Sequence, residues 1–155
     1  MSRCWDLTYD CMRHMKTEIR HSVEQLLSET GALCDTGYAF ALHIRFTRPS
    51  FMYRTYPQSW ISHYDAKGMI IEDPVVKWGL RETGVMRWSD LEDPIGILAD
   101  AAAHGLTNGL ACATGPSSSR SISGFTRSDR VFSDAEAQTL LDITQKLHQL
   151  TQQAL

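Results

Sequence analysis

The segment from Tyr56 to Trp88 constrains the fold more than any other part of the sequence. It contains two proline-started segments, at Pro57 and Pro74, set between runs rich in aromatic and aliphatic residues. Proline suits the first turn of a helix, because its missing N–H would have no helical partner there. Asp73, directly before Pro74, is a candidate helix N-cap. We therefore expect two short helices here, lying between strands.

Segments on both sides of this window predict further elements. Residues 3–30 have apolar side chains at helical spacing, and Gly31 is expected to end that helix. A second Asp-Pro pair at residues 93–94 predicts a helix that Gly105 ends. A capping box at residues 133–136 predicts a long C-terminal helix. Strands are expected at residues 37–46, 50–55, 84–88, 106–114 and 120–126.

The order of these segments predicts the fold class. Short turns between neighbouring strands favour an antiparallel sheet, and the helices before, between and after the strands can cover both faces. We expect one α/β domain over residues 1–155, an α-β-α sandwich with a central, mainly antiparallel sheet of about five strands. No internal repeat or domain boundary interrupts it.

Composition excludes several classes of function. The chain is 43% hydrophobic and 21% charged with a net charge of −3, so it offers no basic stripe to hold a nucleic-acid backbone. No apolar run has the length of a membrane helix, and no secretory signal opens the chain. The four cysteines form no Cys-x-x-Cys pair. We expect reduced thiols in a cytoplasmic protein that does not bind a membrane.

Motifs for catalysis and metal binding are missing from the sequence. There is no Gly-x-Ser-x-Gly elbow and no phosphate-binding glycine loop. The six histidines form no pair at metal-ligand spacing. We therefore expect no enzyme activity, no metal and no cofactor.

The polar side chains of the central window suit a small amphipathic amide. The indole of Trp60 and the phenols of Tyr56 and Tyr64 can donate to carbonyl oxygens, whereas ionised Asp73 only accepts. Leaving such a buried group unpaired costs about 1–3 kcal/mol, which favours an amide over a simple fatty acid. A plainer interpretation also fits. Trp60, Tyr64 and Trp88 could be aromatic core residues, and Asp73 could serve its helix alone.

The pattern Tyr-Pro-x-x-Trp-x-x-x-Tyr, followed by Asp-Pro-Val-Val and Trp-Ser, resembles the autoinducer-binding domain of LuxR-type quorum-sensing regulators. Weaker likenesses at residues 37–40, 104–109 and 120–126 extend the resemblance over most of the chain. It implies an N-acyl homoserine lactone as the ligand. Trp60 would donate to the lactone carbonyl and Tyr56 to the acyl carbonyl. Asp73 would accept from the amide N–H.

The resemblance also implies the walls of the pocket. The residues expected to pack on the ring and acyl chain are Tyr64, Trp88, Val76 and Leu91. Ser123 or Thr126 would reach an acyl oxygen. Strand alternation puts these two on opposite faces, so at most one lines the pocket, and we favour Ser123. Ala39 and Ala41 share one strand face, and their small size would leave room for a longer tail.

The sequence departs from the family pattern at its C-terminus, since residues 1–155 contain no helix-turn-helix domain and contact with DNA would need one. We expect a sensor that couples autoinducer binding to stability and homodimerisation. The alternatives are a naturally short form that dimerises with full-length regulators and inhibits them, or a sensor of a non-lactone molecule. Leu140, Leu147 and Ala154, seven apart, are a candidate dimer face. The other interpretation packs that helix on its own sheet.

Overall fold

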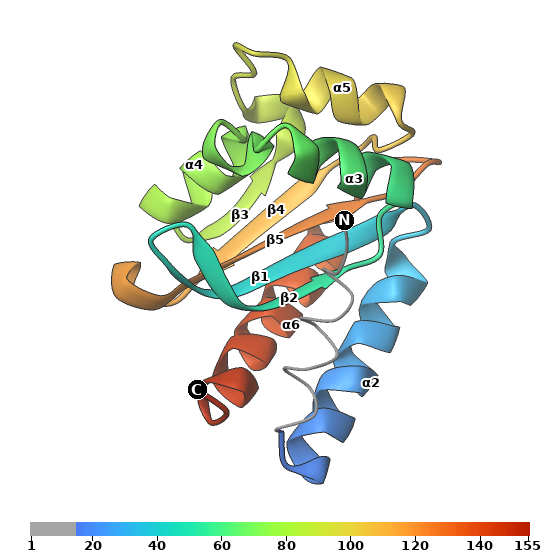
Figure 1. The fold of residues 1–155 in the computed structure, drawn as a ribbon. Helices are drawn as coiled ribbons and strands as arrows, with labels where there is room; N and C mark the ends of the chain where they lie inside the picture. The colour runs from blue at the N-terminus through green and yellow to red at the C-terminus, as the bar shows by residue number, and fades with distance from the viewer. Residues whose placement is uncertain (1–14) are drawn as a thin grey trace.

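The computed structural model describes residues 15–155, which form one antiparallel sheet with helices on both faces (Figure 1). The sheet order is β2-β1-β5-β4-β3, and every neighbouring pair is antiparallel. The strands are β1 (Gly37–Arg45), β2 (Arg48–Arg54), β3 (Gly84–Arg87), β4 (Leu110–Thr114) and β5 (Arg120–Thr126). The predicted fold class is confirmed, although β4 begins later than expected.

Within residues 15–155, five α-helices and three short 3₁₀ turns, η1 to η3, complete the fold. Helices α2 and α6 lie on one face of the sheet, and α3, α4 and α5 lie on the other (Figure 1). Their bounds are α2 (Thr17–Leu33), α3 (Gln58–Ala66), η1 (Met69–Ile71), α4 (Pro74–Arg81), η2 (Trp88–Asp90), α5 (Ile97–Ala103), η3 (Ser117–Ser119) and α6 (Asp134–Gln152).

The two faces of the sheet carry side chains of different size. Under α2 and α6 lies a core of large residues that includes Phe40, Phe125 and Leu140. Under α4 the sheet presents smaller residues such as Ala111 and Ala113. Small side chains fill less of the space between the layers. The side of the three short helices is therefore where a ligand could be held.

A β-bulge in β1 decides which side chains reach each face. The pairing of β1 with β5 shifts register between Ala41 and Ile44, where His43 adopts a φ of 55°. A bulge inserts an extra residue on one strand. His43 therefore turns toward α6, where its Nε2 lies 3.0 Å from Thr151 Oγ1. Ile44 returns to the side of the short helices.

The first helix differs from the prediction at both ends. Residues 3–14 of the predicted helix lie outside the described residues, and α2 runs from Thr17 through Gly31 to Leu33. Gly31 does not end the helix; the chain leaves helical geometry at Cys34, whose φ is −123° and ψ is 83°. A positive φ, 115°, occurs at Gly37, where β1 starts.

The second Asp-Pro pair starts its helix later than predicted. Helix α5 begins at Ile97, because Gly96 takes a φ of 78° and turns the chain just before it. Asp93 nevertheless serves this helix. Its carboxylate accepts from the N–H groups of Leu98 at 3.1 Å and Ala99 at 3.0 Å. The pair thus predicted a helix in this region correctly and its first residue wrongly, since Gly96 is the N-cap.

Helix α6 begins at the predicted capping box. Ser133 Oγ accepts from the Glu136 N–H at 3.1 Å, and the Glu136 carboxylate accepts from the Ser133 N–H at 2.8 Å. Leu140 and Leu147 are fully buried on the sheet, and Ala154 packs on the same core. Of the two interpretations, the structure supports packing of this stripe on the chain's own sheet, so these residues do not form an exposed dimer face. Homodimerisation stays a prediction.

Two of the four cysteines lie in the described part of the chain. Cys34 and Cys112 are buried free thiols, and burial raises the pKa of each to about 12. Both are therefore protonated at neutral pH. Cys4 and Cys11 lie outside the described residues. Among residues 15–155, no helix is both long and apolar enough to cross a membrane.

Candidate ligand-binding site

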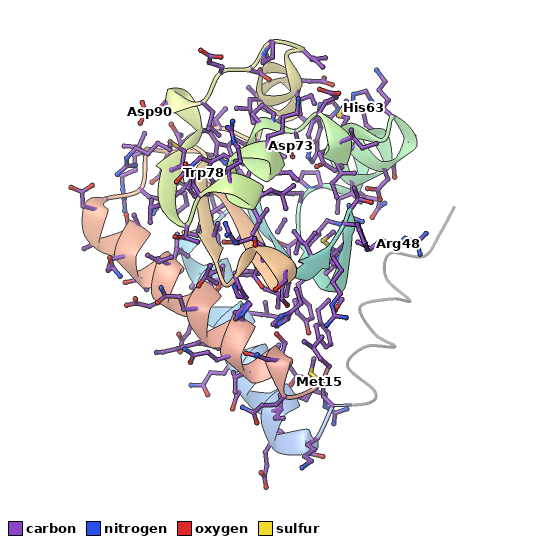
Figure 2. All side chains as sticks on the ribbon, turned by 90° about the vertical axis from the view of Figure 1, so that its left-hand side faces the viewer. Met15, Arg48, His63, Asp73, Trp78 and Asp90 are labelled. Carbon is purple, nitrogen blue, oxygen red and sulfur yellow. The ribbon has the colours of Figure 1, made fainter. Side chains whose placement is uncertain are left out.

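A cavity lies between the sheet and the layer formed by α3, α4 and α5. Its volume, counted as the space that the centre of a water molecule can occupy, is about 100 Å³. The predicted site residues that border it are Tyr56, Trp60, Tyr64, Asp73, Val76, Trp88 and Ser123. Leu91 packs on the neighbouring apolar cluster instead of bordering the cavity. Figure 2 shows Asp73 among the short helices, far from Met15 at the foot of α2.

The floor of the cavity lies on two central strands, where three of four paired residues are small. Ala39 of β1 pairs with Gly124 of β5, and Ala41 pairs with Ile122. All four residues border the cavity. The predicted placement of both alanines on one face is therefore confirmed, while their effect on tail length stays a prediction.

Asp73 divides its two carboxylate oxygens between two partners. Oδ1 accepts from the N–H of Val75 at 2.8 Å and caps α4, and Oδ2 accepts from the Tyr64 hydroxyl at 2.7 Å. Burial raises the pKa of Asp73, and the bonds from Tyr64 and Val75 oppose that rise. A carboxylate oxygen can accept more than one hydrogen bond. Capping α4 therefore leaves Oδ2 able to accept from a ligand as well.

Within the described residues, three hydrogen-bond donors border the cavity without a protein partner, on Tyr56, Trp60 and Trp88. Neither the Tyr56 hydroxyl nor the Trp60 indole N–H bonds to another residue within 15–155. Burial raises the pKa of Tyr56 well above its ordinary value, so its phenol keeps its proton at neutral pH. Trp60 is only 5% exposed. Buried donors are normally satisfied, so these two suit a bound acceptor.

Trp88 forms a wall of the cavity by packing. Its ring lies directly on Gly109, where an added Cβ would fall 1.9 Å from Trp88 Cδ2. Its outer edge approaches Gly124, where an added Cβ would lie 3.5 Å from Cζ2. Its Nε1 is buried with no hydrogen-bond partner in the described part of the chain. Val76, on α4, adds apolar wall as predicted.

The hydroxyl groups of β5 turn away from the cavity. Ser123 borders it, but its Oγ lies 2.9 Å from Thr144 Oγ1 of α6, on the other face of the sheet. Thr126 donates to the Gly37 carbonyl at 3.1 Å, where β1 begins. The expectation that the Ser123 hydroxyl faces the ligand is therefore wrong. Gly124 occupies the cavity-facing position beside it.

Sequence reasoning missed cavity residues on β2 and β5. Arg54 borders the cavity and donates to both carboxylate oxygens of Asp65 on α3, at 2.8 and 3.0 Å. Met52 borders it on the same face of β2. Alternation along β2 was the available signal, but alternation alone does not say which face is buried. Gly124 carried a clearer signal, since an isolated glycine in a strand marks a close approach.

A polar cluster joins α3 to α5 beside Trp60. The rings of His63 and His104 lie 5.8 and 5.2 Å from the Trp60 ring. His63 Nε2 lies 2.6 Å from Asp100 Oδ2, and this hydrogen bond lowers the pKa of Asp100. Among residues 15–155, no group of three His, Cys, Asp or Glu side chains is arranged to hold a metal ion.

Residues 16–155 match the family model of the autoinducer binding domain. The regulatory protein SdiA of Escherichia coli strain K12 is 34% identical over 70 residues, which span 43% of this chain and 29% of SdiA. A crystal structure of Escherichia coli SdiA gives a TM-score of 0.62 at 25% identity, covering 93% of this chain and 63% of the SdiA chain. This chain therefore corresponds to less than two thirds of those proteins.

Two further structures share the fold. CepR2 from Burkholderia cenocepacia, an N-acylhomoserine lactone dependent LuxR family factor, gives a TM-score of 0.66 at 16% identity over 96% of this chain and 92% of its own. SdiA in complex with octanoyl-rac-glycerol gives 0.60 at 24% identity, over 100% of this chain and 67% of its own. The family match extends over nearly the whole chain. The chain therefore belongs to the autoinducer-binding domain family of LuxR-type regulators.

Proposed function

We propose that this ligand-sensing domain binds an N-acyl homoserine lactone in the cavity between the sheet and the short helices. One observation carries the proposal. Two unpartnered donors, Tyr56 and Trp60, and one buried carboxylate, Asp73, border the same apolar cavity. An acyl lactone has two carbonyl oxygens that accept and one amide N–H that donates. That inventory suits Tyr56 and Trp60 as the donors and Asp73 as the acceptor, and the indole N–H of Trp88 is a further unpartnered donor at the cavity.

Each polar group then has a role. Trp60 donates to the lactone carbonyl, Tyr56 donates to the acyl carbonyl, and Asp73 Oδ2 accepts from the amide N–H. The Tyr64 hydroxyl, 2.7 Å from Oδ2, fixes that oxygen. Ligand hydrogen bonds made in a buried site favour the matching molecule, because an analogue that lacks one of the groups leaves its protein partner unpaired.

The remainder of the cavity suits an acyl chain. Its floor is formed by Ala39, Ala41 and Ile122, and Met52 and Val76 add apolar wall. Ligand pockets typically combine such apolar lining with a few placed polar groups. The head group therefore lies at the polar end, and the tail lies over the alanines of β1.

Thermal unfolding with a panel of acyl lactones tests this function. A ligand that binds only the folded state stabilises it by about 2.7 kcal/mol at roughly 100 times its Kd. For a domain of this size that raises the Tm by about 5–10 °C. Trp60→Phe should reduce the shift while the protein stays folded. Folded protein that no lactone stabilises would disprove the proposal.

An acylglycerol is the second candidate ligand. The relative SdiA has been solved in complex with octanoyl-rac-glycerol. Its ester carbonyl accepts and its hydroxyls donate. Tyr56 could therefore donate to the ester carbonyl, and Asp73 could accept from a hydroxyl where it would otherwise accept from the amide N–H of a lactone. The same thermal panel separates the two candidates, because an acylglycerol alone would shift the Tm if the cavity selects hydroxyls over the amide.

Regulation of transcription is the output that family membership supports. The domain would report ligand occupancy to a DNA-binding domain, or would pair with full-length regulators and inhibit them. Either route involves dimerisation, for which the stripe of Leu140 and Leu147 is not available. Light scattering with and without lactone tests it, and a strict monomer in both states would remove the dimer from the proposal.

A further inference from the structure

Tyr56 lies across the sheet between two glycines. At Gly37, an added Cβ would fall 2.9 Å from Tyr56 Cδ1 and 3.0 Å from its Cα. At Gly124, an added Cβ would fall 3.0 Å from the Tyr56 hydroxyl oxygen. The ring edge thus meets the start of β1, and the hydroxyl meets the middle of β5. Contacts this close leave no room for a side chain at Gly37, and at Gly124 a methyl group fits only if the Tyr56 hydroxyl shifts.

Gly124 differs from its neighbours in what it offers the cavity. Ser121 and Ser123, which precede Gly124 on β5, turn their hydroxyls to His148 and Thr144 of α6, on the other face of the sheet. Across the sheet, Gly124 pairs with Ala39 on β1 and with Ala111 on β4. The cavity wall at Gly124 is therefore bare backbone, and the nearest side-chain hydroxyl is that of Tyr56.

We propose that Gly124 is the positioning residue that sets where the Tyr56 hydroxyl stands in the cavity. This inference rests on the proposed function, in which that hydroxyl donates to the acyl carbonyl. A methyl group at position 124 pushes the oxygen by a few tenths of an ångström, and a hydrogen bond weakens when its distance and angle change. The other neighbour of the added Cβ, Trp88 Cζ2 at 3.5 Å, is at an ordinary contact distance.

A four-variant cycle tests the inference with N-octanoyl homoserine lactone as the probe. The variants are the parent, Gly124→Ala, Tyr56→Phe and the double variant. One hydrogen bond contributes about 0.5–1.5 kcal/mol, so Tyr56→Phe and Gly124→Ala should each weaken lactone binding by about 2- to 10-fold. The double variant should bind like Tyr56→Phe alone, because the oxygen that the methyl displaces is gone. Losses that multiply would overturn the inference.

The Tm values of the ligand-free proteins provide a second test, which does not depend on lactone binding. Gly124→Ala should lower the Tm of the parent and should not lower that of Tyr56→Phe, since removing the hydroxyl oxygen makes room for the methyl. If Gly124→Ala does not fold alone, the double variant should fold. Equal destabilisation in both backgrounds, or a double variant that fails to fold, would overturn the inference.

A matched glycine serves as the control. Gly31 lies in α2, and an added Cβ there would meet only Tyr38 Cε1 at 3.9 Å. Gly31→Ala should raise the Tm, because alanine is the better helix former, and should leave lactone affinity unchanged. If the unsubstituted protein binds no lactone, the proposed function is wrong. The Tm values of the four ligand-free proteins still test whether Gly124 positions Tyr56.

Discussion

The Tyr64 hydroxyl donates to Asp73 Oδ2 at 2.7 Å, while the other oxygen of the same carboxylate caps helix α4. The pair ties α3 to the start of α4 across the polar end of the cavity. Asp73 thereby stabilises the start of α4 and also presents an acceptor oxygen at the cavity. The two roles can be separated by substitution, because they use different oxygens.

Asp73→Asn should separate capping from ligand binding. Asparagine is as good an N-cap as aspartate, so the free energy of unfolding should fall by less than about 1 kcal/mol. The amide keeps a single acceptor oxygen and loses the charge that strengthens the ligand bond. Calorimetry should show lactone affinity reduced by about 10-fold. Asp73→Ala, as the comparison, should lower stability by about 0.5–2 kcal/mol through the lost cap and further through the loss of the acceptor for the Tyr64 hydroxyl. Unchanged lactone affinity in Asp73→Asn would contradict the assigned role.

Tyr64→Phe should destabilise the ligand-free domain. It removes the donor that satisfies Asp73 Oδ2 and leaves a buried carboxylate oxygen unpaired. A lost hydrogen bond to a charged group corresponds to about 1.5–3 kcal/mol. Urea unfolding should show a lower midpoint with an unchanged slope. Because that bond also opposes the rise in the pKa of Asp73, the carboxylate should titrate at a higher pH in the variant. A midpoint equal to that of the parent would argue against the pairing.

Gly109→Ala should disrupt the Trp88 wall. The added methyl would fall 1.9 Å from the indole, far inside contact distance, so the ring must leave its place. Overpacking of this kind typically costs about 1–3 kcal/mol. The Tm should fall, and the lactone-induced shift should shrink. Gly31→Ala again provides the control. A Tm and a lactone-induced shift equal to those of the parent would mean that Trp88 does not form the wall.

Acid should destabilise the domain through His43 and His148. The His43 ring on β1 lies 4.2 Å from the His148 ring on α6, and burial lowers the pKa of each below the ordinary 6.5. Groups with a lowered folded pKa keep their stability contribution above about pH 6.5, and they lose it as the pH falls through the folded pKa. The Tm should therefore drop as the pH falls below about 6.5.

A histidine substitution identifies the source of that drop. His148→Gln removes one titrating ring beside Ser121, whose Oγ lies 2.7 Å from His148 Nδ1. It should flatten the dependence of Tm on pH. The exposed His21 of α2 is the matched control, and His21→Gln should leave the dependence as it is in the parent. Equal pH dependence in all three proteins would exclude the histidine pair as its source.

Local signals in the sequence predicted local structure well. The Asp73-Pro74 start and the Ser133–Glu136 capping box appear as expected, because each involves neighbours along the chain. The orientation of Ser123 was not predictable in the same way. It depends on how β5 pairs with β1 across the sheet, and β1 contains a bulge at His43 that no spacing rule reveals.

The role of the last helix was likewise open from the sequence. An apolar stripe through Leu140 and Leu147 shows that one face of the helix is covered, but not by what. The structure shows the sheet of the same chain on that face. Gly124 gave a usable signal as a lone glycine in a strand, yet its partner, Tyr56, lies far away in sequence and becomes evident only in the fold.

Isothermal titration of the folded domain with N-acyl homoserine lactones of different chain length tests the central claim most directly. Saturable binding of one lactone per chain, with a negative heat-capacity change from buried apolar surface, is the predicted result. The affinity should drop in Trp60→Phe and in Asp73→Asn while both variants remain folded. Absence of saturable binding by every lactone, from protein shown to be folded, would contradict the claim.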